Sequence, residues 1–163
     1  MAKIYHLLRG RLLPDVFKTN SLEYVPTGFP PNREFIKQYD ISQIWVNLVL
    51  DFCNSIPGAT NYIQIRIDGE GMGLNYSTAV VNADELKCFS FFAIFHPETF
   101  NQPYPKSRCA GKHTIDIYAS VYNGMGKYAG VGTFKTDLAQ LDVYEILLDE
   151  PELISKSLPK ISG

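Results

Sequence analysis

Three segments of the chain alternate apolar and polar residues with a period of two, and no other feature constrains the fold as strongly. In the segment 44–52, Ile, Val, Leu and Phe occupy every second position, and the segments 62–68 and 113–122 repeat the pattern. Successive side chains of a β-strand point to opposite faces, so this period is expected when one face is buried. The sequence therefore predicts a strand-rich chain in which 44–52 is a central antiparallel strand.

Shorter strands are expected at 77–81, 89–95 and 127–134. The last of these follows Asn123-Gly124, a pair typical of tight hairpin turns because both of its residues tolerate positive φ. Gly130 and Gly132 within it predict a bulge or the close approach of another part of the backbone. This segment is therefore expected to form the return strand of a hairpin that begins in 113–122.

Two segments predict helices. Asn82 stands three residues before Glu85, the spacing of a capping box, and predicts a short helix through Lys87 or Cys88. Thr136 is placed to cap a second helix that runs to about Leu148. Its residues at helical spacing are Leu138, Leu141, Tyr144, Glu145 and Leu148, with Glu145 as the polar exception. The expected fold class is therefore α+β: a single domain with a twisted antiparallel β-sheet and a few short helices, preceded by an extended N-terminal arm.

The 163 residues match the usual size of one domain. We expect a basic and Pro/aromatic arm at 1–33, a globular β-rich domain at 34–150 and a polar C-terminal tail at 151–163. The segment 19–32 holds three prolines and a glycine, which disfavour helix and ladder hydrogen bonding. It is either a plain surface loop or a docking segment for self-association. The residues expected to carry that docking are Tyr24, Pro26, Phe29, Pro30 and Pro31.

The net charge of −2 conceals segments of opposite sign. Basic residues prevail in 1–18 and 101–135, whereas 137–152 holds six carboxylates and no base. Such a chain is suited to binding copies of itself or an anionic partner, although an ordinary mixed surface explains the pattern equally well. The residues expected to meet an anionic surface, such as nucleic acid or lipid, are Lys3, Arg9, Arg11, Lys18, Lys106, Arg108, Lys112 and Lys127.

No common catalytic, metal-binding or phosphate-binding motif is present. Cys109 and His113 are the only thiol and base close in sequence, and a bystander thiol is the simpler interpretation. Glycines alternate in Asp68–Gly73, but the spacing and the helix that a dinucleotide site requires are missing, which favours a flexible turn. We therefore expect a protein that is not an enzyme, with no catalytic residues, no metal and no small-molecule cofactor.

The chain is expected to be soluble and to reside in a reducing compartment. Its three cysteines form no Cys-x-x-Cys pair, which disfavours a disulfide scaffold or a zinc site. The apolar pair Leu7-Leu8 is too short for the core of a secretory signal, and no window is apolar enough for a membrane-spanning helix. A cytosolic or nuclear protein follows.

A basic N-terminus followed by the Pro/aromatic stretch Leu22-Glu-Tyr-Val-Pro26 and a β-rich domain resembles the matrix proteins of rhabdoviruses, especially those of plant-infecting members. The resemblance implies 21–31 as a segment that docks on a neighbouring copy and 44–134 as a sheet accompanied by helices. A dense lysine run is absent, and the stretch Pro30-Pro31-Asn32-Arg33 is not the Pro-Pro-x-Tyr budding motif of some members.

The resemblance further implies a viral structural protein that self-associates and bridges a nucleocapsid to a membrane. Its implied partners are further copies of itself, a nucleocapsid protein and an anionic membrane. Its implied location is the host cytoplasm or nucleus and the virion, peripheral to the membrane, not secreted and not transmembrane. The alternative is a soluble β-rich ligand-binding protein or small enzyme with a pocket near 97–113, where a long loop holds several prolines.

Overall fold

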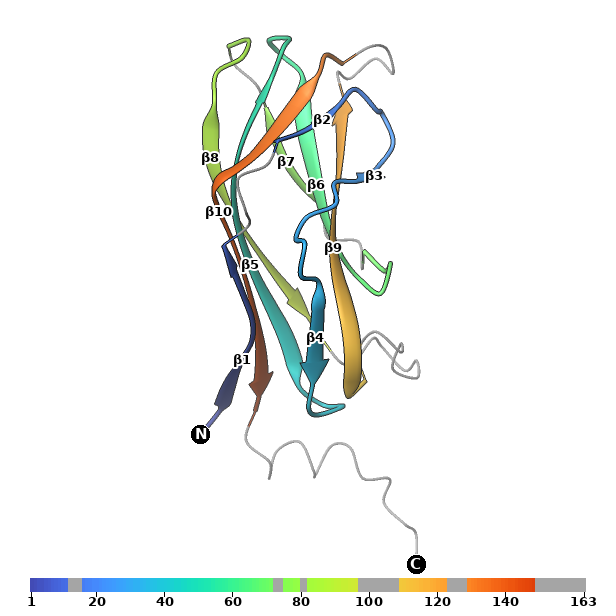
Figure 1. Ribbon diagram of the computed structural model, residues 1–163, viewed down its shortest axis with the longest axis vertical. Helices are drawn as coiled ribbons and strands as arrows, with labels where there is room; N and C mark the ends of the chain where they lie inside the picture. The colour runs from blue at the N-terminus through green and yellow to red at the C-terminus, as the bar shows by residue number, and fades with distance from the viewer. Residues whose placement is uncertain (12–15, 72–74, 80–81, 97–108, 123–128, 149–163) are drawn as a thin grey trace, which may run out of the picture.

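The computed structural model describes residues 1–11, 16–71, 75–79, 82–96, 109–122 and 129–148. These residues form ten β-strands and no helix (Figure 1). The strands are β1 (Lys3–Arg11), β2 (Val16–Thr19), β3 (Val25–Pro26), β4 (Glu34–Lys37), β5 (Gln43–Asn54), β6 (Thr60–Ile67), β7 (Asn75–Ala79), β8 (Lys87–Phe95), β9 (Gly111–Tyr122) and β10 (Gly132–Leu147). All strand pairings are antiparallel.

The first sheet, sheet A, has the order β1-β10-β5-β8. The long strand β10 changes register between Lys135 and Gln140. Its first part pairs with β2 and its second part with β1, so these two short strands follow one another along the same side of β10. The prediction that 44–52 is a central antiparallel strand is confirmed, because β5 lies between β10 and β8.

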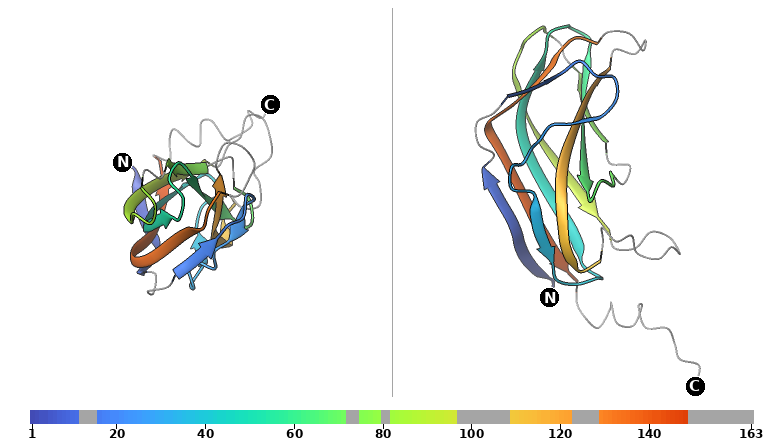
Figure 2. Two further views of the ribbon diagram at one scale, coloured as in Figure 1. Left: turned by 90° about the horizontal axis from the view of Figure 1, so that it is seen from above. Right: turned by 45° about the vertical axis from the view of Figure 1, so that its right-hand side comes forward.

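The second sheet, sheet B, has the order β3-β9-β6-β7, and β4 also pairs with β9. β4 pairs with the beginning of β9 and β3 with its later part. The predicted strands at 62–68 and 113–122 are thus confirmed as β6 and β9, and they are hydrogen-bonded neighbours. The strands of both sheets run along the long axis of the molecule (Figure 2).

The strand order identifies the architecture as a jelly roll. When β1 with β2 and β3 with β4 are counted as two interrupted strands, each sheet holds four strands, and the chain passes repeatedly from one sheet to the other. Two facing antiparallel sheets of four strands with this order are a jelly roll, built from two Greek keys. The crossing also applies to β9 and β10, which lie in different sheets. The expected hairpin between them is therefore wrong, while the turn residues 123–124 lie outside the described part.

Apolar side chains fill the space between the sheets. Leu48 of β5, Ile65 of β6 and Ile117 of β9 have at most 1% of their surface exposed. They belong to one cluster to which both sheets contribute. Full burial of each such side chain stabilises the fold by about 1.5–3 kcal/mol. The interior is therefore a packed core, and the outward side chains are the ones available for contact with other molecules.

The predicted α+β class is wrong, because both expected helices are absent. Residues 82–86 form a turn in which Asn82 Nδ2 donates to Glu85 Oε2 (2.8 Å), and β8 begins at Lys87. So few residues cannot hold a stable helix before the chain joins the sheet. The second expected helix is the later part of β10, where Leu141 and Leu147 point into the core. Pairing with β1 and β5 prevails over the helical spacing.

The N-terminal segment joins the sandwich instead of extending from it. β1 and β2 pair with β10, and β3 pairs with β9. The boundary at residue 33 stays a prediction about domain organisation, and these pairings are contacts across it. Among the residues that the structure describes, no helix is long and apolar enough to cross a membrane.

Candidate interaction surfaces on the two sheets

The outer face of sheet A carries large apolar side chains. Trp45 of β5 is the register partner of Tyr144 on one side and of Ile94 on the other, and His6 of β1 is opposite Tyr144. Ile94 completes a row across all four strands, and Phe92, two residues before it on β8, contacts Trp45 on the same face. We call His6, Tyr144, Trp45, Phe92 and Ile94 the aromatic row.

Ring contacts hold the aromatic row in place. The rings of His6 and Tyr144 stack with centroids 4.6 Å apart, and Trp45 meets Phe92 edge to face at 5.5 Å. His6 Nε2 lies 3.0 Å from the buried Asp142 carboxylate. Phe92 nevertheless keeps 48% of its surface exposed. Exposed, ordered aromatic side chains of this kind are typical of protein–protein contacts.

The outer face of sheet B has a different chemistry. Tyr62 of β6 and Tyr118 and Tyr122 of β9 point outward, and Tyr24, which precedes β3, lies beside them. The Tyr62 and Tyr122 rings meet edge to face with centroids 6.3 Å apart. Arg66 of β6 places its guanidinium carbon 3.8 Å from the centroid of the Tyr118 ring. We call these four tyrosines and Arg66 the Tyr–Arg face.

Electrostatics on the Tyr–Arg face favour hydrogen-bond donation. Burial raises the pKa of Tyr24, and the neighbouring Tyr62 raises it further, while Arg66 and a hydrogen bond with Ser120 act in the opposite direction. The net effect keeps the Tyr24 phenol protonated. Arg66 Nε donates to Gln64 Oε1, which fixes the plane of the guanidinium against Tyr118.

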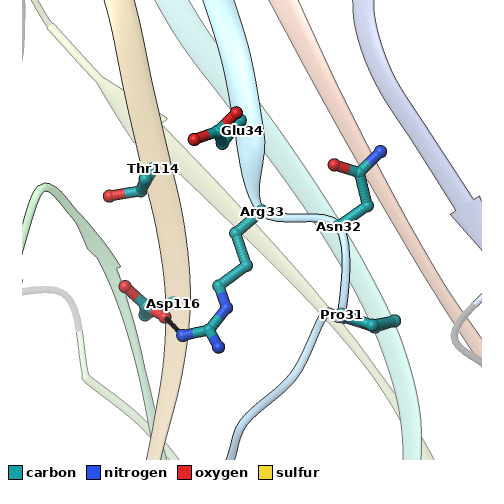
Figure 3. Close-up of a pocket in the computed structure, with 6 residues that line it drawn as sticks. All are labelled: Pro31, Asn32, Arg33, Glu34, Thr114 and Asp116. Atoms are coloured by element: carbon teal, nitrogen blue, oxygen red, sulfur yellow. Dashed lines mark hydrogen bonds and ion pairs between the residues drawn. The ribbon is translucent and has the colours of Figure 1, made fainter.

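A shallow depression of about 520 Å³ adjoins the Tyr–Arg face (Figure 3). Its lining residues are Pro31, Asn32, Arg33, Glu34, Thr114 and Asp116. Figure 3 shows Arg33 reaching from the segment before β4 to Asp116 on β9, with Nη1 2.7 Å from Oδ1. The guanidinium is thus already engaged by a carboxylate, and the depression is open to solvent. This geometry suits the rim of a contact surface more than an enclosed ligand pocket.

A buried ionic network closes the end of the sandwich where β4 turns into β5. Glu145 is completely buried and accepts hydrogen bonds from the backbone N–H groups of Gln38 and Tyr39 and from Ser42 Oγ. Lys37 is 2% exposed and donates to the carbonyls of Tyr39 and Asp40. Burial lowers the pKa of Lys37 to about 8, against the opposing effect of Glu145. The network ties sheet A to sheet B.

His113, the base close in sequence to the Cys109 thiol, is engaged in structural contacts. The two ring nitrogens of His113 lie 2.6 Å from the Asp68 carboxylate and 2.6 Å from the backbone oxygen of Cys109. His113 is buried against Phe35. Its contacts hold the turn after β6 and the residues before β9. In the described part of the chain, no three His, Cys, Asp or Glu side chains are placed to share a metal ion.

The residues expected to mediate docking are divided between the interior and the surface. Phe29 is 5% exposed and packs edge to face on Phe17, and Pro30 is also buried. Pro26 pairs with Tyr118 through β3, and Pro31 lines the depression. Together with Tyr24 on the Tyr–Arg face, these residues lie in or beside sheet B. Their docking role stays a prediction.

The expected anionic-surface residues do not form one patch among the described residues. Lys3, Arg9 and Lys18 are exposed on β1 and β2 at the edge of sheet A. Lys112 lies on β9 and pairs with Glu34 at 2.9 Å. The side chains of Arg11, Lys106, Arg108 and Lys127, like most of the loop expected to border a pocket, lie outside the described residues. Binding to an anionic surface stays a prediction.

Sequence reasoning missed Arg66, Trp45 and Phe92 as surface residues of interest. Each occupies an outward position of a strand, and the alternation already places Trp45 and Arg66 opposite the buried side. The presence of aromatic and charged side chains at those outward positions was the available sign that they could form a contact surface. Their neighbours across the strands depend on the register, which the alternation does not specify.

Comparison with known proteins assigns no family. No protein-family model matches the chain, and no curated protein matches it. Similar solved structures include infectious bursal disease virus of the Gt strain (TM-score 0.46, 12% identity) and the VP2 subviral particle of infectious bursal disease virus (TM-score 0.48, 10% identity). Each match covers 90% of this chain, but only 33% and 32% of the other chain. This chain therefore spans about a third of their length, and the overlap is too loose to assign a function.

The resemblance to rhabdovirus matrix proteins is wrong. It implied a sheet accompanied by helices, whereas the described residues form two sheets in jelly-roll order without a helix.

Proposed function

We propose that this protein is a non-enzymatic structural protein of a virus particle that assembles with copies of itself. The observation that carries the proposal is the jelly-roll strand order around a packed core. Jelly rolls of two four-stranded sheets are characteristic of viral capsid domains, and they also occur in lectins and cupins. Because one fold hosts many functions, the choice among these rests on the surfaces.

The packed interior favours assembly over ligand chemistry. The inward side chains of β5, β6, β9 and β10 are apolar except at a few buried polar positions, and both sheets contribute to one core. A ligand site between the sheets would require space that these side chains fill. Contacts with other molecules are therefore assigned to the outer faces, the edges and the loops.

The aromatic row supports self-association. It presents Phe92 and Trp45 on the outer face of sheet A, where a solitary subunit would leave them in contact with water. Aromatic anchors that are rigid before binding lose little conformational entropy on contact, so they supply much of the binding free energy of an interface. We assign this surface to a second copy of the chain.

A substitution of Phe92 by Asp tests the proposal. Phe92→Asp places a charge in the aromatic row but removes no core side chain, so the fold should persist. We expect the concentration for half-maximal association, measured by sedimentation velocity, to rise at least tenfold. Val16→Asp is the matched control, since Val16 is 48% exposed like Phe92 but lies on β2 beside Lys135, outside the aromatic row, and should associate as the wild type does. Equal association of Phe92→Asp and wild type would refute the assignment.

A further inference from the structure

We propose that the Tyr–Arg face binds the acidic segment 149–152 of a neighbouring copy of the chain. The inference rests on the proposed self-assembly and names a second contact for it, on the opposite sheet from the aromatic row. An aromatic-row contact between like surfaces joins two subunits only, whereas a contact between unlike surfaces continues from one subunit to the next. A closed shell requires more than one kind of contact.

Arg66 is prepared to bind a carboxylate. Its Nε is occupied by Gln64 and its plane is held against Tyr118, yet its terminal Nη groups have no hydrogen-bond partner among the described residues. No described carboxylate forms an ion pair with it. A fixed guanidinium with free terminal N–H groups matches the geometry of a carboxylate, to which it donates two parallel hydrogen bonds.

The charge of the surrounding surface limits the kind of partner. Arg33 is neutralised by Asp116 and Lys112 by Glu34, which leaves Arg66 as the unneutralised cation of the outer face among the described residues. A polyanion such as nucleic acid is bound through many cations, each neutralising a phosphate. One cation among four tyrosines suits instead a protein segment with few carboxylates and some apolar surface, because tyrosines offer rigid, amphipathic contact area.

The chain itself contains such a segment. Asp149, Glu150 and Glu152 provide three carboxylates within four residues, and Leu153 and Ile154 follow directly. Pro151 among them disfavours a helix and biases the preceding residue towards an extended conformation, which a flat sheet face accommodates. Carboxylates for Arg66 and apolar side chains for the tyrosine rings are thus adjacent in one short stretch.

Reach favours a segment from another copy of the chain. β10 ends with Leu147 beside Lys3, at the end of the sandwich where β4 also ends (Figure 1). Arg66 is paired with Asp116, five residues along β9 from that end, or about 17 Å at ~3.4 Å per residue. It also lies on the other sheet, about 10 Å away, and one strand sideways, about 5 Å more.

The straight-line separation from the end of β10 is therefore about 20 Å, and the path over the end of the sandwich, about 10 Å across and about 17 Å along, is about 27 Å. Glu152 follows Leu147 by five residues, which span at most about 18 Å when fully extended. The backbone of one chain therefore spans only part of this path to its own Arg66, whereas a segment from a neighbouring subunit has no such restriction.

Complementary charge reversal in the full-length protein tests this contact. Arg66→Glu removes the guanidinium that donates to the segment, and the combined substitution Asp149→Lys, Glu150→Lys and Glu152→Lys reverses the charge of the segment. We expect each variant to raise the concentration for half-maximal association about tenfold or more, with an effect that shrinks at high salt. Lys18→Glu changes the net charge by the same amount as Arg66→Glu but lies on the edge strand β2, and this variant should associate as the wild type does.

An equimolar mixture of the two variants decides between contact within and between chains. The Arg66→Glu variant keeps the acidic segment and the lysine-substituted variant keeps Arg66, so the two chains can bind each other. The mixture should therefore recover the wild-type association as mixed oligomers. A wild type that associates while Arg66→Glu is unaffected would overturn the inference and leave the proposed function intact. Failure of the mixture to recover would overturn contact between copies. A wild type that stays monomeric would contradict the proposed function itself, and with it this contact.

Discussion

Replacing Glu145 by Gln should cause one of the larger losses of stability available from a single substitution. The carboxylate is completely buried and serves three donor groups, two backbone N–H groups and Ser42 Oγ. Glutamine keeps the shape but offers a single acceptor oxygen and turns an NH₂ group toward donors. The substitution also leaves the buried ammonium of Lys37 without its nearby negative charge.

The expected magnitude follows from these contacts. Leaving a buried donor without its acceptor costs about 1–3 kcal/mol and more beside a charge, so the loss of this acceptor for three donor groups is expected to cost about 3–5 kcal/mol. For a chain of this size, such a loss lowers Tm by about 10 °C or somewhat more. Urea unfolding monitored by tryptophan fluorescence should show a lower midpoint with an unchanged slope.

Two comparisons make the result specific. Glu34→Gln removes a carboxylate whose side chain is 57% exposed and paired with Lys112, and should cost less than about 1 kcal/mol. The double variant Lys37→Met, Glu145→Gln should lose about 1 kcal/mol less than the sum of its single variants, since both charges leave together. A loss below about 1 kcal/mol for Glu145→Gln would refute the assignment of a buried, fully coordinated carboxylate.

Two further predictions concern pH and backbone geometry. The pKa of Lys37 is lowered to about 8, so between pH 8 and about 10.5 the unfolded chain binds the proton that the folded chain has released. The stability of the wild type relative to Lys37→Met, measured by urea titration, should therefore rise over this window. A flat or falling difference would contradict the burial of the amine. Gly130→Ala should destabilise the fold more than Gly28→Ala in thermal unfolding. Both glycines have positive φ, which costs an alanine about 1–3 kcal/mol at either position. Only at Gly130 would the added Cβ also meet Asn54, Ser55 and Ile56. Equal losses would contradict the close approach at Gly130.

The alternation of residues predicted the main strands but not their partners. Leu48, Ile65 and Ile117 are buried as the period of two requires, while the atoms that come close to Gly130 belong to the side chains of Asn54, Ser55 and Ile56. Period-two alternation identifies a strand and its buried face, but the same pattern fits any order of strands. The expected hairpin of 113–122 with 127–134 is wrong for this reason, because β9 and β10 lie in different sheets.

The wrong helix at 136–148 has a comparable origin. Residues at helical spacing, such as Leu141 and Leu148, are present, but Leu141, Val143 and Leu147 also alternate, and this second pattern is the one that the sheet uses. Glu145 obscured the alternation because a carboxylate at an inward position reads as an exposed residue. Its burial depends on donors from the turn after β4, more than a hundred residues away in the sequence.

The surfaces were even less accessible to sequence reasoning. Arg66 and Tyr118 occur on different strands, and their stacking requires the register between β6 and β9. Trp45 and Phe92 likewise meet only through the pairing of β5 with β8. Side chains of suitable type were visible at outward positions, but their grouping into the aromatic row and the Tyr–Arg face depends on the fold.

Sedimentation velocity of the full-length wild type over a wide range of concentrations tests self-assembly most directly. The aromatic row and the Tyr–Arg face predict a sedimentation coefficient that rises with concentration, through small oligomers toward larger assemblies, and a weaker rise at high salt. A single species with the mass of one 18.4 kDa chain at every concentration would contradict the proposed structural role.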